Sequence, residues 1–142
     1  MPTVCVDASL VLPLFIPEQL SAQARALWRG WVSRTVDRVA PPLLQAEVTS
    51  VVRQAVYRGR LQPDEGEAAF QMFCALRIQI LESRDLHRQA WQLARRFQQP
   101  RAYDAFYLAA AREAGCDLWT GDRRLVNSLR VPWVRWIGDL QA

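Results

Sequence analysis

Short runs rich in β-branched residues alternate with longer segments of helical periodicity along the whole chain. Residues 3–6 are too few for a buried helix and end at an acid, which favours a strand. In residues 42–58, apolar side chains recur every three or four positions, which favours an amphipathic helix. The same patterns predict strands at 3–6, 35–40, 77–81, 118–120 and 134–137, and helices at 7–15, 18–32, 42–58, 63–76, 85–97, 101–115 and 123–128.

Strands separated by helices predict an α/β fold with a parallel sheet and right-handed crossovers. At 142 residues the chain is most simply one domain, 1–142, and its hydrophobic share of 51% is typical of a globular protein. Ligands of such sheets bind beyond the carboxyl ends of the strands. We therefore expect functional residues at that edge.

Four acidic residues from distant parts of the sequence are predicted to meet at this edge. Asp7 ends the first strand, and Asp122 follows the strand at 118–120 by two residues. Asp104 begins a helix that leads into that strand, and Glu47 lies in the first turns of the helix that follows the second strand. For each aspartate taken alone, an N-cap role is an alternative explanation.

The position of Glu47 is not explained by capping, because it lies inside its helix on the apolar side, next to Leu44 and Val51. A buried, unpaired carboxylate is costly, and clustered carboxylates raise one another's pKa. A divalent cation would remove both costs. Oxygen ligands without His or Cys favour Mg²⁺ or Mn²⁺, so the four acids predict a metal site.

The charged residues exclude several kinds of active site. All 18 basic residues are Arg, and the net charge is +4. Without Lys, a P-loop and Schiff-base chemistry are excluded, and the single His87 excludes a multi-histidine metal site. The use of Arg alone is explained either by a compositional bias or by recognition of phosphate, which guanidinium groups bind bidentately.

Other residues favour a cytoplasmic protein. The three cysteines are far apart and in apolar company, which favours reduced packing residues over a disulfide set or a zinc site. The longest apolar runs are too short to span a bilayer, and the first residues lack the features of a signal peptide.

Trp28 and Trp31 share a helix face, which indicates either core packing or a partner groove.

Four motifs in this order resemble the PIN-domain family, and in particular its VapC-type toxin ribonucleases. Each motif is short, but together they extend over nearly the whole chain. They are VCVDAS at 4–9, PLLQAE at 42–47, YDAFYLA at 103–109 and LWTGDRRL at 118–125.

The resemblance implies a three-layer α/β/α sandwich, flavodoxin-like or FEN-like, with a central parallel sheet. It also implies a Mg²⁺- or Mn²⁺-dependent endoribonuclease. By matching positions, an acidic quartet and two supporting hydroxyl residues carry over to this chain. The quartet is Asp7, Glu47, Asp104 and Asp122, and the hydroxyl residues are Ser9 and Thr120.

The implied reaction is hydrolysis of RNA by a metal-activated water, without a protein nucleophile. Asp7 and Asp104 would bind the principal ion directly, and Glu47 and Asp122 would act through water or hold a second ion. The hydroxyl residues would orient carboxylates, or alternatively make only local turn hydrogen bonds.

Without Lys, Arg must make any contact to RNA. The candidates are Arg53, Arg123 and Arg124, for which a solvated surface position is the alternative. Tyr103 and Tyr107 would either stack on a base or pack in the protein.

The resemblance further implies a homodimer and a small antitoxin protein as partners, together with the RNA substrate. Several alternatives stay open. They are a PIN-fold RNA-processing nuclease outside a toxin–antitoxin system, a nuclease acting on DNA, and a non-catalytic PIN-fold binding module. A receiver module is disfavoured because it requires a Lys.

Overall fold

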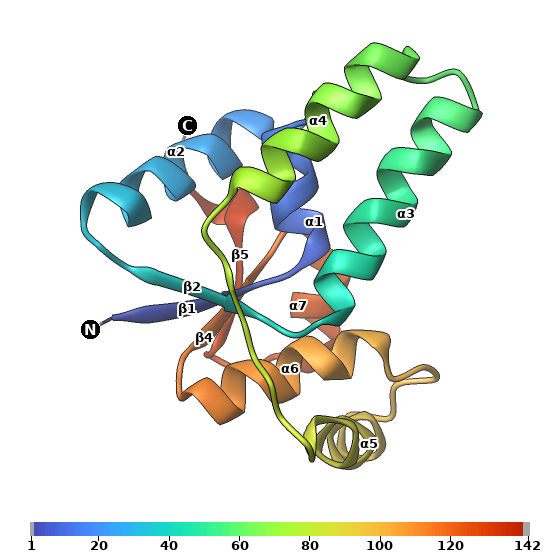
Figure 1. Cartoon of the computed structure of the whole chain (residues 1–142). Helices are drawn as coiled ribbons and strands as arrows, with labels where there is room; N and C mark the ends of the chain where they lie inside the picture. Colours follow the sequence, from blue (N-terminus) through green and yellow to red (C-terminus); the bar gives the residue numbers. More distant parts are fainter. Residues whose placement is uncertain (1, 141–142) are drawn as a thin grey trace.

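Five parallel strands form one central sheet in the computed structural model, which describes residues 2–140 (Figure 1). The sheet order is β3-β2-β1-β4-β5, and every neighbouring pair is parallel, so the predicted architecture is confirmed. Because β1 lies in the centre, the chain moves outward first through β2 and later through β4, which makes the space between β1 and β4 a topological switch point. The strands are β1 (Thr3–Val6), β2 (Asp37–Ala40), β3 (Gln79–Ile80), β4 (Asp117–Thr120) and β5 (Val134–Trp136).

Helices cover both faces of the sheet, which confirms the three-layer arrangement. α6 contacts β1, β2 and β4, and α5 packs on its outer side (Figure 1). The short α1 and the longer α2 lie on the opposite face, and α3 and α4 form a hairpin that extends from it (Figure 1). The helices are α1 (Ala8–Val11), α2 (Ser21–Ser33), α3 (Leu43–Tyr57), α4 (Pro63–Ala75), α5 (Leu86–Arg96), α6 (Tyr103–Ala114) and α7 (Arg123–Leu129), with 3₁₀ turns η1 (Leu12–Leu14) and η2 (Ile137–Asp139).

Some element boundaries differ from the sequence prediction. The helix predicted at 7–15 is α1 followed by η1, because Pro13 has no N–H to donate and the chain tightens into a 3₁₀ turn. The helix predicted at 18–32 begins only at Ser21, and the strand predicted at 77–81 is reduced to Gln79–Ile80. The predicted end of α6 is confirmed, since Gly115 adopts a left-handed conformation with φ +66°.

The core explains two further sequence features. Trp28 and Trp31 are buried with their rings edge to face at 5.9 Å, and Trp31 also contacts Trp119, so core packing is the correct alternative for this pair. In α3, Val51 is exposed and Val52 is buried instead, so that part of the predicted apolar stripe was wrong. No helix within residues 2–140 is long and apolar enough to cross a membrane.

Candidate metal centre and active site

Asp7 and Asp122 lie at the carboxyl edge of the sheet, at the switch point between β1 and β4. Asp7 directly follows β1, and Asp122 follows β4 by two residues. The two strands are neighbours in parallel register, with Val6 opposite Trp119. Since parallel strands end at the same edge, the predicted proximity of these two acids is confirmed.

The carboxylate of Asp7 is held by hydrogen bonds on both oxygens. Oδ1 accepts from the Ser9 hydroxyl at 2.7 Å and from the Leu10 backbone N–H at 3.1 Å, while Oδ2 accepts from the Thr120 hydroxyl. The bond from Leu10 makes Asp7 the N-cap of α1, so the capping explanation is correct for this residue. Capping uses only Oδ1, whereas the two hydroxyl groups come from α1 and β4 and fix the carboxylate from both sides.

The two hydroxyl groups are also acceptors in a second set of bonds. The backbone N–H of Gly121 donates to Ser9 Oγ at 2.9 Å, and that of Asp122 donates to Thr120 Oγ1 at 3.0 Å. Each hydroxyl has one hydrogen, and its donation to Asp7 leaves none for the 3.1 Å contact between Ser9 Oγ and Thr120 Oγ1. The network therefore links the turn after β4 to Asp7, in agreement with the predicted supporting position of the two hydroxyl residues.

The turn after β4 requires a glycine. A Cβ on Gly121 would lie 2.5 Å from the Ser9 carbonyl oxygen, closer than real Cβ contacts allow. On the other side of the turn, Trp136 Nε1 donates to the Gly121 carbonyl at 3.3 Å. Asp122 then caps α7, accepting from the backbone of the first residues of that helix through Oδ1. The turn thus sets the direction in which Asp122 leaves the sheet.

Glu47 is held by a residue from another helix. Tyr107 on α6 donates its hydroxyl to Glu47 Oε1 on α3 at 2.6 Å. The Tyr107 side chain is buried, so it packs in the protein and does not stack on a base. Glu47 is half-buried and hydrogen-bonded, whereas the sequence suggested a buried, unpaired carboxylate. Sequence reasoning missed this bond. The available signal was the spacing of Tyr107, which lies three residues after Asp104 and therefore on the same side of the helix.

Asp104 lies in the first turn of α6 but does not cap it. The N-cap is Ala102, so the capping alternative is wrong for this aspartate. Within residues 2–140, no hydrogen bond or ion pair is formed by the Asp104 carboxylate. It is therefore the acid of the quartet that the protein itself leaves unpaired.

The four acids form one electrostatic group. The pKa of Asp104 is raised by burial first, and then by the negative charges of Asp122 and Glu47. Burial raises the pKa of Asp7 to about 6, against the opposing effect of its hydrogen bonds to Thr120, Ser9 and Leu10, and the charge of Asp104 adds to the rise. The interactions thus connect Asp104 with each of the other three acids.

These acids fit a hard divalent cation by their chemistry. Carboxylate oxygens are the preferred ligands of such ions, and a bound cation would offset both the burial and the mutual repulsion that raise the pKa of Asp7 and Asp104. In the described part of the chain, however, no three His, Cys, Asp or Glu side chains are already arranged as ligands of one ion. The residues therefore form an acidic site whose carboxylates need side-chain rotation or bridging waters to share an ion.

The candidate RNA contacts differ in their relation to the acids. Arg123 and Arg124 directly follow Asp122 and are exposed; the Arg123 guanidinium lies over the Trp136 ring at 5.0 Å. Arg53 lies on α3 six residues after Glu47, or about 9 Å further along the helix, and lines a hollow between α3 and α4. Tyr103, at the start of α6, is exposed. The structure thus brings Arg123 and Arg124 next to the acids, but not Arg53.

Comparisons with known proteins agree with this geometry. The family model for the PIN domain matches residues 4–128. Ribonuclease VapC9 of Mycobacterium tuberculosis is 30% identical over 125 residues, covering 88% of this chain and 90% of that protein. Ribonuclease VapC3 of Pyrobaculum aerophilum is 33% identical over 127 residues, covering 86% and 91%.

A solved structure shows the same fold. A toxin–antitoxin complex from Klebsiella pneumoniae contains a chain that superposes with a TM-score of 0.67, at 17% identity, over 94% of this chain and 97% of that one. The matched family model covers all four acids and both supporting hydroxyl residues. The chain belongs to the PIN-domain family.

Proposed function

We propose that this chain is a metal-dependent endoribonuclease that hydrolyses RNA phosphodiester bonds and acts as the toxin of a type II toxin–antitoxin pair. The names of its curated relatives support the ribonuclease activity. The observation that carries the proposal is the electrostatic group at the carboxyl edge of the sheet, where the unpaired Asp104 feels the charges of Asp122 and Glu47. An acidic group of this kind disfavours a phosphate until a cation neutralises it.

In this proposal Asp7 and Asp104 hold Mg²⁺ or Mn²⁺, and Glu47 and Asp122 complete its surroundings. When bound, the ion supplies a water of lowered pKa and offsets charge on the attacked phosphate. Asp7 is held in place by its hydrogen-bond network, so it provides a fixed oxygen, whereas Asp104 is free to turn toward the ion. Tyr107 keeps Glu47 directed toward the same edge.

RNA is proposed to lie over this edge, in contact with the basic and aromatic residues around it. Arg123 and Arg124 are exposed directly after Asp122, and their guanidinium groups suit phosphate oxygens. The exposed Tyr103 ring, next to Asp104, offers a surface on which a base can stack. Arg53 is the weaker candidate, because α3 carries it away from the acids.

The proposed partners are a small antitoxin protein and a second copy of the chain. The shared fold with a chain of a toxin–antitoxin complex supports the first. An RNA substrate and free cysteines are consistent with action in the cytoplasm. The second candidate, a PIN-fold RNA-processing nuclease outside such a pair, uses the same acids and differs only in its partner.

Purified protein incubated with labelled RNA or DNA and Mg²⁺ or Mn²⁺ tests the activity. Cleavage of RNA that EDTA abolishes, and that Asp104→Asn loses while Asp139→Asn retains, is the expected result. Asp139 is a suitable control because it is an exposed acid in η2. No cleavage under any metal condition would leave only the non-catalytic binding module.

Growth on expression separates the toxin from the processing nuclease. The wild-type chain should arrest growth, Asp104→Asn should not, and co-expression of the protein encoded by a neighbouring small gene should relieve the arrest. Active enzyme without growth arrest would favour the processing nuclease.

A further inference from the structure

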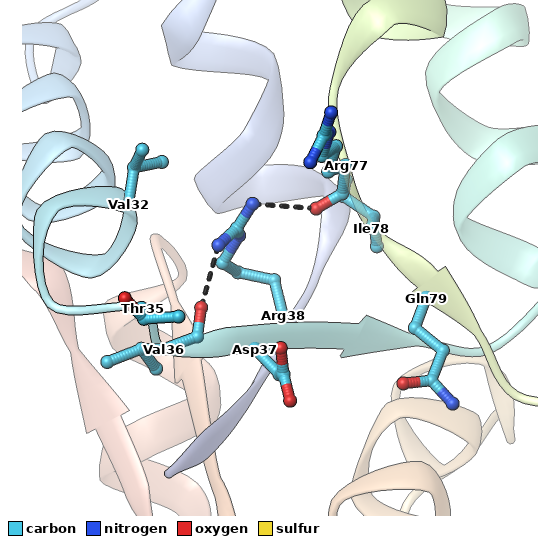
Figure 2. A pocket seen from close by; sticks show the side chains of 8 residues that line it. All are labelled: Val32, Thr35, Val36, Asp37, Arg38, Arg77, Ile78 and Gln79. Atoms are coloured by element: carbon cyan, nitrogen blue, oxygen red, sulfur yellow. Dashed lines mark hydrogen bonds between the residues drawn. The ribbon is translucent and has the colours of Figure 1, made fainter. Parts of the chain in front are cut away.

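A hollow lies at the opposite edge of the sheet from the acids. It has a volume of about 420 Å³ and is formed where β2 and β3 begin (Figure 2). Its lining includes Asp37 and Gln79, the first residues of these two strands. Because the strands are parallel, their amino ends face away from the carboxyl edge, so this hollow is separate from the candidate active site.

Arg38 is a cation held in place at this hollow. Its two terminal nitrogens donate to the carbonyl oxygens of Val36 at 2.7 Å and Arg77 at 2.9 Å, as Figure 2 shows. Its guanidinium also lies over the Trp28 ring at 5.2 Å. The remaining Nε is enclosed and has no acceptor within residues 2–140. The group is thus fixed in position, while part of its donor capacity is unused.

The arginines of the hollow have no ion-pair partner in the described part of the chain. Burial is the largest cause that lowers the pKa of Arg38; the negative charge of Asp37 opposes this effect, and the positive charge of Arg77 adds to it. In the described residues, neither guanidinium lies within 4.0 Å of a carboxylate oxygen, since the ion pairs there are those of Arg88 and Arg135. The acid in the lining, Asp37, projects from the other side of β2 (Figure 2). The two arginines therefore line the hollow without a carboxylate in contact, although the charge of Asp37 acts on Arg38 from the other side of the strand.

Thr35 adds a hydroxyl to the rim in an unfavourable backbone conformation. It follows the end of α2 with φ +58°, in the left-handed region that a β-branched residue rarely adopts. The backbone bonds from Thr35 to Val32 and from Val36 to Trp31 form a helix terminus at which glycine is the usual residue. A threonine at this position on the rim therefore carries a cost in backbone energy.

We propose that this hollow binds a phosphate group, with Arg38 and Arg77 as its cationic ligands. Planar guanidinium forks suit the oxygens of phosphate, and their charge strengthens each hydrogen bond. The phosphate comes either from solution or from the backbone of a nucleic acid. The proposal does not depend on nuclease activity, because it uses none of the acids.

Arginine side-chain NMR tests the proposal directly. Sodium phosphate is titrated into the full chain at constant ionic strength, and the Nε–Hε signals of Arg38 and Arg77 are followed. A saturable shift of both signals is expected, and Arg77→Gln should weaken binding about tenfold, as expected for loss of one charged hydrogen-bonding group. Arg84→Gln, an exposed arginine outside the lining, should leave it unchanged.

Further observations complete the test. A short single-stranded oligonucleotide that displaces phosphate at the same signals identifies a nucleic-acid backbone as the source. Shifts that do not saturate, an unaltered affinity in Arg77→Gln, or equal binding of acetate would overturn the proposal.

Discussion

The Tyr107 hydroxyl of α6 donates a 2.6 Å hydrogen bond to Glu47 Oε1 of α3, and so joins two segments of the proposed active site that are far apart in the sequence. Tyr107→Phe removes this bond and keeps the buried ring. Because the ring remains, we expect the fold to survive with a loss of about 1–2 kcal/mol in the free energy of unfolding. RNA cleavage should fall about tenfold to a hundredfold through kcat, because Glu47 is no longer held toward the ion.

The KM for RNA separates positioning from substrate contact. Tyr107 is buried and is not proposed to touch RNA, so this KM should not change, whereas the Mn²⁺ concentration for half-maximal rate should rise. Tyr57→Phe, at an exposed tyrosine on the same helix as Glu47, is the matched control. Equal kinetics in the wild type and Tyr107→Phe would show that the bond has no role in the site.

Asp104→Asn should have opposite effects on activity and stability. The substitution removes a half-buried charge that also repels Asp122 and Glu47, and these are the causes that raise the pKa of Asp104. Without divalent ions, the melting temperature should therefore rise, while Mn²⁺-dependent cleavage should be lost. The measurements are calorimetry in EDTA and cleavage of labelled RNA, with Asp139→Asn as control. A lower melting temperature in EDTA would mean that Asp104 makes a stabilising interaction.

Gly121→Ala tests how tightly the turn after β4 packs against α1. The added Cβ would meet the Ser9 carbonyl oxygen at 2.5 Å, so the turn must move away from the residues that hold Asp7. We expect a loss of about 1–3 kcal/mol in the free energy of unfolding, together with reduced cleavage. Gly30→Ala in α2 is the control, and it should stabilise the protein by up to about 1 kcal/mol, because its Cβ meets only the flexible Arg34 side chain. Equal stability of Gly121→Ala and the wild type would contradict this packing.

The sequence predicted the strands of the sheet and the position of acids at its carboxyl edge, because both depend on local patterns. Short β-rich runs indicated the strands, and an acid at the end of a strand lies at the carboxyl edge wherever the strands are parallel. The proximity of Asp7 and Asp122 therefore follows from the chain's pattern of strands and helices. Boundaries were less well predicted where a single residue decides them, as at Pro13, where the missing N–H replaces the helix by a 3₁₀ turn.

The partners of the acids could not be predicted in the same way. The bond from Tyr107 to Glu47 depends on how α3 and α6 cross, and this packing is not visible in the periodicity of either helix. Whether Asp104 caps α6 also depends on where that helix begins. Its N-cap is Ala102, two residues before Asp104, so the Asp104 carboxylate is left unpaired. The hollow around Arg38 depends on two strand starts and the end of α2, so no sequence motif marks it.

The buried carboxyl of Asp7 should make stability fall as the pH rises toward neutrality. Burial raises its pKa to about 6 in the folded protein, from 3.8 for an exposed aspartate. Below about pH 3 the group is mostly protonated in both states and has little effect. Between about pH 4 and pH 6 the unfolded chain ionises first, so the free energy of unfolding decreases, by about 3 kcal/mol in total above pH 6.

Denaturation in EDTA at a series of pH values measures this effect as the difference between the wild type and Asp7→Asn. Asparagine keeps an acceptor for the N–H of Leu10, so the cap of α1 is preserved while the titrating group is lost. The difference should grow in favour of Asp7→Asn from pH 4 to pH 6 and then remain constant. Mg²⁺ or Mn²⁺ should reduce it, since a cation favours the ionised carboxylate in the folded state only. Parallel stability curves for the two proteins would show that Asp7 titrates normally and that burial does not disfavour its ionised form.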